Sequence, residues 1–108
     1  MLSMNELNLV HRIETILRKR GCWVLKTHGS NLRLGVPDLL ISYPISTSCG
    51  MAVSVFVAIE VKIPGKKPTA IQEYELAKIR KSGGIAFYAD DPDSVIETIE
   101  REIQCRSS

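Results

Sequence analysis

The segment AVSVFVAIEVKI, residues 52–63, constrains the fold more than any other part of the chain. Its β-branched and aromatic residues make it the strongest strand signal in the sequence. The segment PGKKP at 64–68 must end that strand, because two prolines bracket a glycine there. The first half is apolar on both faces, which predicts a strand that is buried on both sides. Alternation then places Glu60 and Lys62 on one face at its end.

The segments around this strand predict further strands and a first helix. Apolar residues recur at helical spacing over residues 4–20, and Gly21 is suited to end that helix. Short apolar or aromatic runs predict three more strands, at residues 22–26, 38–42 and 85–89. Turn-forming residues predict connections at 27–37 and 43–50.

Two cap patterns predict the later helices. Thr69 and Gln72 fit a capping box that opens a helix ending at Ser82. Asp91 followed by Pro92 fits an N-cap and a first helical residue, which starts a last helix to about residue 104. The resulting order, α-β-β-β-α-β-α, predicts an α/β fold with a central mixed β-sheet flanked by helices.

Bulk composition limits the class of protein. A chain of 108 residues with 44% hydrophobic and 24% charged residues predicts one domain over residues 1–108. We expect no transmembrane helix and no secretory signal, and Glu6 and Glu14 disfavour a transit peptide. The three cysteines are odd in number and far apart, which indicates reduced thiols. We therefore expect a cytoplasmic or otherwise intracellular protein without a membrane partner.

Charge is unevenly distributed along the chain. The formal net charge is only +2, but basic residues dominate the body of the chain and acidic residues gather from Asp90 to Glu102. Each basic cluster can be a solvated helix face or loop. Together, the clusters permit a surface that binds phosphates without requiring one.

Asp38 is a second carboxylate that could lie near Glu60 at the end of the long strand. It begins a buried strand directly after Pro37, which has no N–H and so fixes where the ladder begins. On neighbouring strands, Asp38 and Glu60 would converge at one edge of the sheet. Two converging carboxylates suit Mg²⁺, and Lys62 could orient a water or offset charge on a phosphate. The alternative is that the strand has simply reached solvent, where Glu60 and Lys62 pair.

The first helix offers a third carboxylate. The apolar face of this helix points in nearly the same direction as Glu6, whereas Glu14 lies toward its flank. We expect Glu6 to point at the sheet, and Glu14 is the second candidate. A glutamate in the first turn can also face water and favour the helix dipole.

These residues together resemble the PD-(D/E)xK nuclease superfamily. Its pattern is similar to Pro37-Asp38 followed by Glu60-Val61-Lys62. Within it, the chain resembles the VRR-NUC group, the virus-type replication-repair nucleases. The resembling features also include Gly35 before Pro37-Asp38, an early helical glutamate, a lysine-rich turn, and Gln72 at the start of the next helix. The resemblance extends over nearly the whole chain.

The resemblance implies a restriction-endonuclease-like core and a role for each matching residue. Asp38, Glu60 and the main-chain carbonyl of Val61 would hold Mg²⁺ or Mn²⁺, and Glu6 would complete the site directly or through water. Lys62 would position or polarise the attacking water. Gln72 would orient Lys62 or a water near the scissile phosphate.

The function implied is a metal-dependent DNA endonuclease that acts on branched substrates, such as a Holliday (four-way) junction resolvase in replication, recombination or repair. One alternative is a nuclease for flap or linear DNA, like a restriction enzyme, although the short chain leaves little room to read bases. Another is a non-catalytic DNA-binding module on the same fold. Intact Asp38, Glu60 and Lys62 weigh against that module.

Two further expectations concern partners. Four basic residues lie in segments that flank the two motif strands, and we expect them to contact DNA phosphates. They are Lys26, Arg33, Lys66 and Lys67. We also expect a homodimer, because resolving a junction of approximate two-fold symmetry needs two nicks. The candidate interface is the 43–53 connection, which carries Tyr43, Ile45 and Met51.

Overall fold

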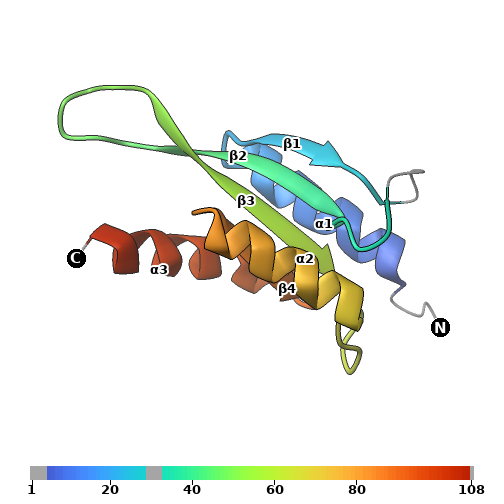
Figure 1. The fold of residues 1–108 in the computed structure, drawn as a ribbon. Helices are drawn as coiled ribbons and strands as arrows, with labels where there is room; N and C mark the ends of the chain where they lie inside the picture. Colours follow the sequence, from blue (N-terminus) through green and yellow to red (C-terminus); the bar gives the residue numbers. More distant parts are fainter. Residues whose placement is uncertain (1–4, 29–32, 108) are drawn as a thin grey trace.

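A four-stranded sheet in the order β1-β2-β3-β4 organises the residues that the computed structural model describes, 5–28 and 33–107 (Figure 1). The strands are β1 (Trp23–Lys26), β2 (Leu39–Ile45), β3 (Val53–Val61) and β4 (Ile85–Ala89). The helices are α1 (Glu6–Lys19), α2 (Ala70–Lys81) and α3 (Val95–Ser107), with a short 3₁₀ helix, η1 (Pro92–Ser94), before α3. The predicted order of helices and strands is confirmed.

The sheet is mixed, as predicted. β1 pairs with β2 and β2 with β3 in antiparallel fashion, whereas β3 and β4 run parallel. The register places Lys26 opposite Leu39, and Leu39 opposite Ile59. The end of β1, the start of β2 and the end of β3 therefore meet at one end of the sheet. Asp38 directly precedes Leu39 and Glu60 directly follows Ile59 in the chain. The two acidic residues therefore come from neighbouring strands at that end.

Helices cover both faces of the sheet (Figure 1). The core under α1 and α3 is mainly aliphatic, and its most buried members include Leu9, Ile13, Leu17, Ile41, Ile59 and Ile99. On the other face, Leu76 of α2 forms a smaller core with Ala58 and Ala86. Burying one such large aliphatic side chain contributes about 1.5–3 kcal/mol. These two layers pack against opposite faces of the sheet that carries the residues at its end.

Strand β2 is longer than the sequence predicts. Residues 43–45, expected in a connection, pair with β3, and Tyr43 is completely buried. The Tyr43 hydroxyl donates a hydrogen bond to Glu100 of α3. β1 begins at Trp23, opposite Ser42, so among the described strands Pro44 has a neighbour only in β3, and a proline is tolerated on such an edge. The prediction that Tyr43 belongs to an exposed dimer interface is wrong.

The first half of β3 is exposed, contrary to the prediction of burial on both sides. Val53 and Phe56 are 37% and 48% exposed. Figure 1 shows the reason, since the β2–β3 hairpin projects beyond the helices that cover the rest of the sheet. Burial on both faces begins only at Val57 and continues to the end of the strand.

The helix ends follow local capping. Asn5 caps α1 by accepting a hydrogen bond from the Asn8 N–H, so the described helix begins at Glu6, and part of the predicted first turn lies outside the described residues. Asp91 caps η1, so a 3₁₀ helix precedes α3, which continues beyond the predicted end near residue 104. The capping box of Thr69 and Gln72 is confirmed. None of the described helices is long and apolar enough to cross a membrane.

Candidate metal centre

Asp38 is fixed by both neighbouring strands. Its backbone carbonyl accepts a hydrogen bond from the Thr27 N–H at 2.8 Å, just beyond β1, and the Thr27 hydroxyl donates to the carbonyl of Pro37. The Asp38 carboxylate is almost buried, and its Oδ2 accepts a hydrogen bond from the Val61 N–H at 2.8 Å. Backbone contacts on one side and a side-chain contact on the other therefore hold the carboxylate at the end of the sheet.

Gly35 allows the turn before Asp38 to lie against α2. Its φ of +87° belongs to the left-handed region that favours glycine. A Cβ at this position would lie 2.4 Å from Cγ2 of Ile71 and 3.0 Å from its carbonyl oxygen. Gly35 thus combines an unusual backbone conformation with a close approach to a helix. Gly35 therefore lets the turn before Pro37 pack against α2 and present Asp38 at the end of the sheet.

Glu60 is the most unusual carboxylate among the described residues. It is 1% exposed, and its Oε1 has no hydrogen-bond partner among them. The Lys62 ammonium lies 3.6 Å from its Oε2. Burial, followed by the negative charge of Asp38, raises the pKa of Glu60 to about 8, although Lys62 opposes the shift. The strand has therefore not simply reached solvent at Glu60, and a buried carboxylate with one unused oxygen is suited to bind a cation.

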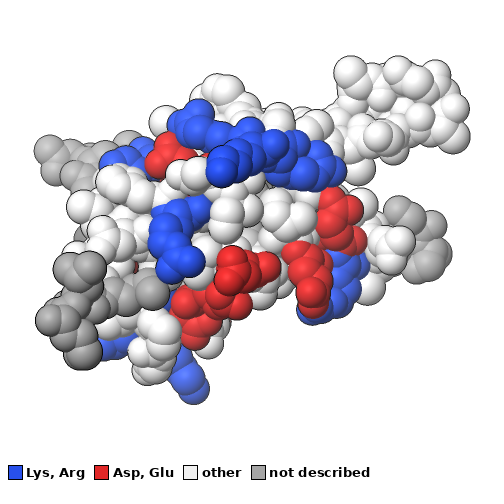
Figure 2. All heavy atoms as spheres, turned by 180° about the vertical axis from the view of Figure 1, so that it is seen from behind, with Lys and Arg blue, Asp and Glu red and all other residues white. Residues whose placement is uncertain are grey.

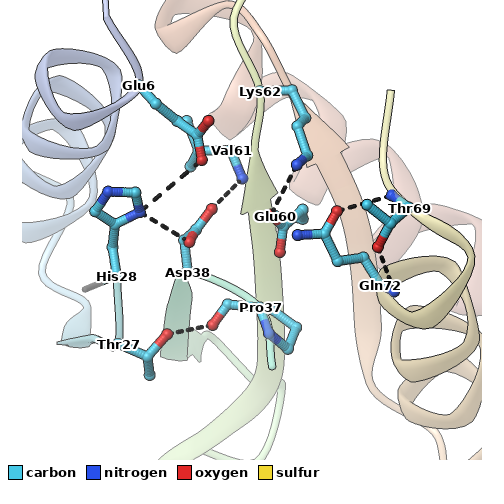
Figure 3. A network of polar contacts seen from close by, with 10 residues as sticks. All are labelled: Glu6, Thr27, His28, Pro37, Asp38, Glu60, Val61, Lys62, Thr69 and Gln72. Carbon is cyan, nitrogen blue, oxygen red and sulfur yellow. Dashed lines mark hydrogen bonds and ion pairs between the residues drawn. The ribbon is translucent and has the colours of Figure 1, made fainter. Parts of the chain in front are cut away.

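Glu6 and His28 lie on the other side of Asp38 (Figure 3). The His28 Nδ1 atom is 3.0 Å from Asp38 Oδ1 and 3.9 Å from Glu6 Oε1. Ligand atoms of these three residues all lie within 4.8 Å of one another, which is close enough to share a metal ion. Glu14 instead pairs with Arg18 of its own helix at 2.8 Å. The geometry therefore favours Glu6 as the helical glutamate of the site.

Gln72 reaches the site from the start of α2. Its Oε1 accepts a hydrogen bond from the Thr69 N–H at 2.8 Å, as one half of the capping box. The same contact turns the side-chain amide nitrogen toward Glu60 (Figure 3). Cap formation and site geometry thus depend on one side chain. The position fits the expected role of orienting a group near Lys62.

The residues at this end of the sheet fit a hard divalent cation. The carboxylates of Asp38, Glu60 and Glu6 are oxygen ligands of the kind that Mg²⁺ and Mn²⁺ take. The partnerless Oε1 of Glu60 shows that the carboxylate group is not satisfied by the described protein atoms alone. Because a bound cation would offset the charge held there, metal binding would favour ionised Glu60.

Comparisons with known proteins agree with this arrangement. No family model and no curated protein matches the chain. A solved structure described as a "VRR_NUC domain" matches with a TM-score of 0.63 and 27% identity, over 91% of this chain and 97% of the other. A second, a "VRR_NUC domain protein", matches with a TM-score of 0.67 and 18% identity, over 95% and 91% of the two chains. The chain has the fold of a VRR-NUC domain. The resemblance seen in the sequence is confirmed at the level of fold.

The basic residues expected to contact DNA fall into two groups on this VRR-NUC fold. Lys26, Lys66 and Lys67 are exposed, at the end of β1 and in the turn after β3. Arg33 is different, because its guanidinium pairs with the Glu75 carboxylate of α2 at 2.6 Å. That contact ties the loop before Asp38 to the helix. Arg33 therefore has a structural role alongside any contact with phosphate.

The buried Glu60 predicts a pH-dependent stability of the metal-free domain. Between about pH 4.5 and 8, Glu60 keeps its proton when folded but loses it when unfolded, so the free energy of unfolding falls as pH rises. The slope is at most about 1.4 kcal/mol per pH unit. This stability is fully present below pH 4.5 and is lost as pH rises through 8.

Thermal unfolding in a chelator across this pH range measures the effect. The side chain at position 60 is neutral at every pH in Glu60→Gln, so the stability of this variant should depend less on pH than that of the wild type. The difference in the free energy of unfolding between the two proteins should grow as pH rises. Parallel profiles for the two proteins would show that burial does not hold the proton on Glu60.

Proposed function

We propose that this VRR-NUC domain is a Mg²⁺- or Mn²⁺-dependent DNA endonuclease that selects branched DNA and resolves four-way junctions. One observation carries the proposal. A fully buried Glu60 with an unused carboxylate oxygen lies beside Asp38 and within 3.6 Å of the Lys62 ammonium. A non-catalytic DNA-binding module has no physical use for a buried carboxyl group with an unsatisfied oxygen beside a second acidic group.

Each residue has a distinct part in phosphodiester hydrolysis. Asp38 and Glu60, with the Val61 carbonyl and Glu6, would hold the cation. When bound, this ion would polarise the scissile phosphate and lower the pKa of a water. The Lys62 ammonium would orient the attacking water and offset charge that builds on the phosphate.

The hydrolysis itself needs one water and no other reactant. The water oxygen forms a bond to phosphorus, the opposite phosphorus–oxygen ester bond breaks, and the departing oxygen takes a proton. The side-chain amide of Gln72 faces the same space and would position a water or the Lys62 ammonium there (Figure 3).

The distribution of charge supports an approach of DNA from the end of the sheet. Figure 2 shows acidic side chains gathered over α3, which contributes Glu97, Glu100 and Glu102. Phosphates would be repelled from that surface. Lys26, Lys66 and Lys67, in contrast, lie in segments next to Asp38 and Glu60.

Replacing Lys66 and Lys67 together by alanine should weaken binding to every DNA substrate. Each exposed lysine that contacts a phosphate releases about one counterion, so the slope of log affinity against log salt should fall by about two. Fluorescence anisotropy across a salt series measures this slope. The matched control is Lys78→Ala with Lys81→Ala, at the opposite end of α2. An unchanged slope for the Lys66 and Lys67 variant, or an equal fall in the control, would place the DNA elsewhere.

Selection of a branched substrate distinguishes this proposal from the alternatives. A gel comparing a four-way junction, a flap and a linear duplex, with and without Mg²⁺, should show metal-dependent nicks mainly in the junction. Preferential cleavage of the flap or the linear duplex would support the alternative nuclease. Binding of the junction without cleavage of any substrate would support the non-catalytic module.

The proposal includes a homodimer with two active sites. Tyr43 cannot contribute to its interface, but Met51 is 64% exposed at the hairpin. Trp23 and Phe56 are also exposed, and both lie opposite Ser42, so they share one face of the sheet. Contacts between these apolar side chains would stabilise an isologous pair.

Light scattering at micromolar concentration measures the mass. A dimer is expected for the wild type and a monomer for Trp23→Asp with Phe56→Asp. A wild-type monomer that nicks both strands of a junction in one binding event would contradict the two-site arrangement.

A further inference from the structure

We infer that His28 is a direct ligand of the bound metal through Nδ1, and that this nitrogen shifts the site's preference from Mg²⁺ toward Mn²⁺. The inference rests on the metal site of the proposed function and adds a residue to it. No sequence motif singles out His28. The structure places it beside two of the predicted ligands.

The position of His28 is set by the same backbone contacts that fix Asp38. Thr27 immediately precedes it, and both the N–H and the hydroxyl of Thr27 are bonded to the Pro37-Asp38 segment. Successive residues thus bring the imidazole and the Asp38 carboxylate together. The His28 side chain is only 26% exposed, so most of it is already covered by its neighbours.

The distances around His28 Nδ1 fit a shared coordination sphere. With metal–ligand bonds of about 2.1 Å, adjacent octahedral ligands lie about 3.0 Å apart and opposite ones about 4.2 Å apart. The separations of 3.0 Å to Asp38 Oδ1 and 3.9 Å to Glu6 Oε1 lie within this range. A hydrogen bond to Asp38 accounts for the first distance alone. A shared ion accounts for both.

Glu60 provides an independent sign that this site takes a ligand. It is 1% exposed, its Oε1 has no hydrogen-bond partner among the described residues, and it faces the opposite side of the Asp38 carboxylate (Figure 3). Asp38 therefore lies between Glu60 on one side and Glu6 and His28 on the other (Figure 3). Its carboxylate is shared by both sides of the site.

A nitrogen ligand changes which ion the site prefers. Mg²⁺ binds oxygen ligands and retains its waters, whereas imidazole suits transition ions, and Mn²⁺ accepts both kinds of ligand. Replacement of His28 by a residue that offers oxygen should therefore weaken Mn²⁺ binding more than Mg²⁺ binding. We expect the ratio of the two affinities to fall about tenfold or more in His28→Gln.

His11 provides a matched control for His28. The chain contains two histidines, and His11 is exposed on α1. Pulsed electron paramagnetic resonance of the Mn²⁺-loaded protein detects nitrogen bound to the ion, without DNA or turnover. Nitrogen coupling is expected in the wild type and in His11→Gln, and its loss is expected in His28→Gln. Calorimetry on the three proteins gives the affinity ratio, which should fall only in His28→Gln.

Isotope labelling gives a second test that keeps His28 in place and so does not depend on whether His28→Gln folds. In His11→Gln grown with ¹⁵N-histidine, the ¹⁴N signal should be replaced by that of ¹⁵N from His28. Mn²⁺ that binds in a Glu60-dependent manner without nitrogen coupling would overturn the role of His28 and leave the proposed metal site intact. No Mn²⁺ binding, or binding indifferent to Glu60→Gln, would instead refute the metal site and with it this role.

Discussion

Lys62→Ala should slow single-turnover DNA cleavage by about 10²- to 10⁴-fold, the range in which a positioned acid–base group contributes to catalysis. The ammonium lies 3.6 Å from Glu60 Oε2, and its side chain is only 13% exposed. It is therefore held in the site, where it can act on a water or a phosphate. Binding of the junction should stay within a few-fold, because Lys62 is one of 14 basic residues in the chain.

The control for this variant is Lys26→Ala, which removes an exposed lysine at the end of β1. That change should weaken binding without a comparable loss of the cleavage rate at saturating protein. Cleavage and binding that fall in parallel in Lys62→Ala would show that Lys62 serves only as part of a basic surface. A thermal melt of Lys62→Ala establishes that the variant remains folded.

Asp38→Asn and Glu60→Gln should each weaken Mn²⁺ binding at least tenfold and reduce cleavage by about 10³-fold or more. Both changes keep the shape of the side chain and remove one negative charge. Titration calorimetry with Mn²⁺ measures the first effect and single-turnover cleavage the second. Metal affinity that is unchanged in both variants would overturn the assignment of the site.

The two variants differ in a way that separates chemistry from folding. Glu60→Gln replaces a carboxyl group that burial already keeps neutral in the metal-free protein, so it should not destabilise that form near neutral pH. Asp38→Asn alters a group bonded to Val61 and His28, so some loss of stability is expected. An inactive but fully stable Glu60→Gln would show that catalysis, rather than folding, requires the charge.

The sequence predicts the convergence of Asp38 and Glu60 well because both lie at strand ends. Pro37 marks where one strand begins, and the prolines at 64 and 68 limit the other. Neighbouring antiparallel strands then bring a start and an end together. Glu6 follows from helical periodicity in the same way, since its direction is set within one helix.

The sequence does not reveal contacts that depend on tertiary packing. His28 reaches Asp38 because Thr27 continues the pairing of β1 beside β2, a register that no local pattern specifies. Tyr43 next to Pro44 looks like a turn, but pairing with β3 and the contact with Glu100 bury it. Arg33 looks like a free cation in a loop until α2 brings Glu75 to it.

The apolar run in β3 shows a second limit. Apolar residues on both faces predict burial, yet the outer half of this strand extends past the helices with Phe56 exposed. Periodicity identifies which residues share a face but gives no measure of how far the helices extend over that face. The exposed side chains there are the reason to expect an apolar partner surface, such as a second copy of the chain.

Single-turnover cleavage of a four-way junction tests the central claim most directly. Three reactions should be compared on the same junction: wild-type protein in Mg²⁺, wild-type protein in a chelator, and Glu60→Gln in Mg²⁺. All proteins should be purified in the same way. The account predicts nicks only in the first reaction, with both others slower by about 10³-fold or more. Cleavage in the chelator, or by Glu60→Gln at the wild-type rate, would contradict it.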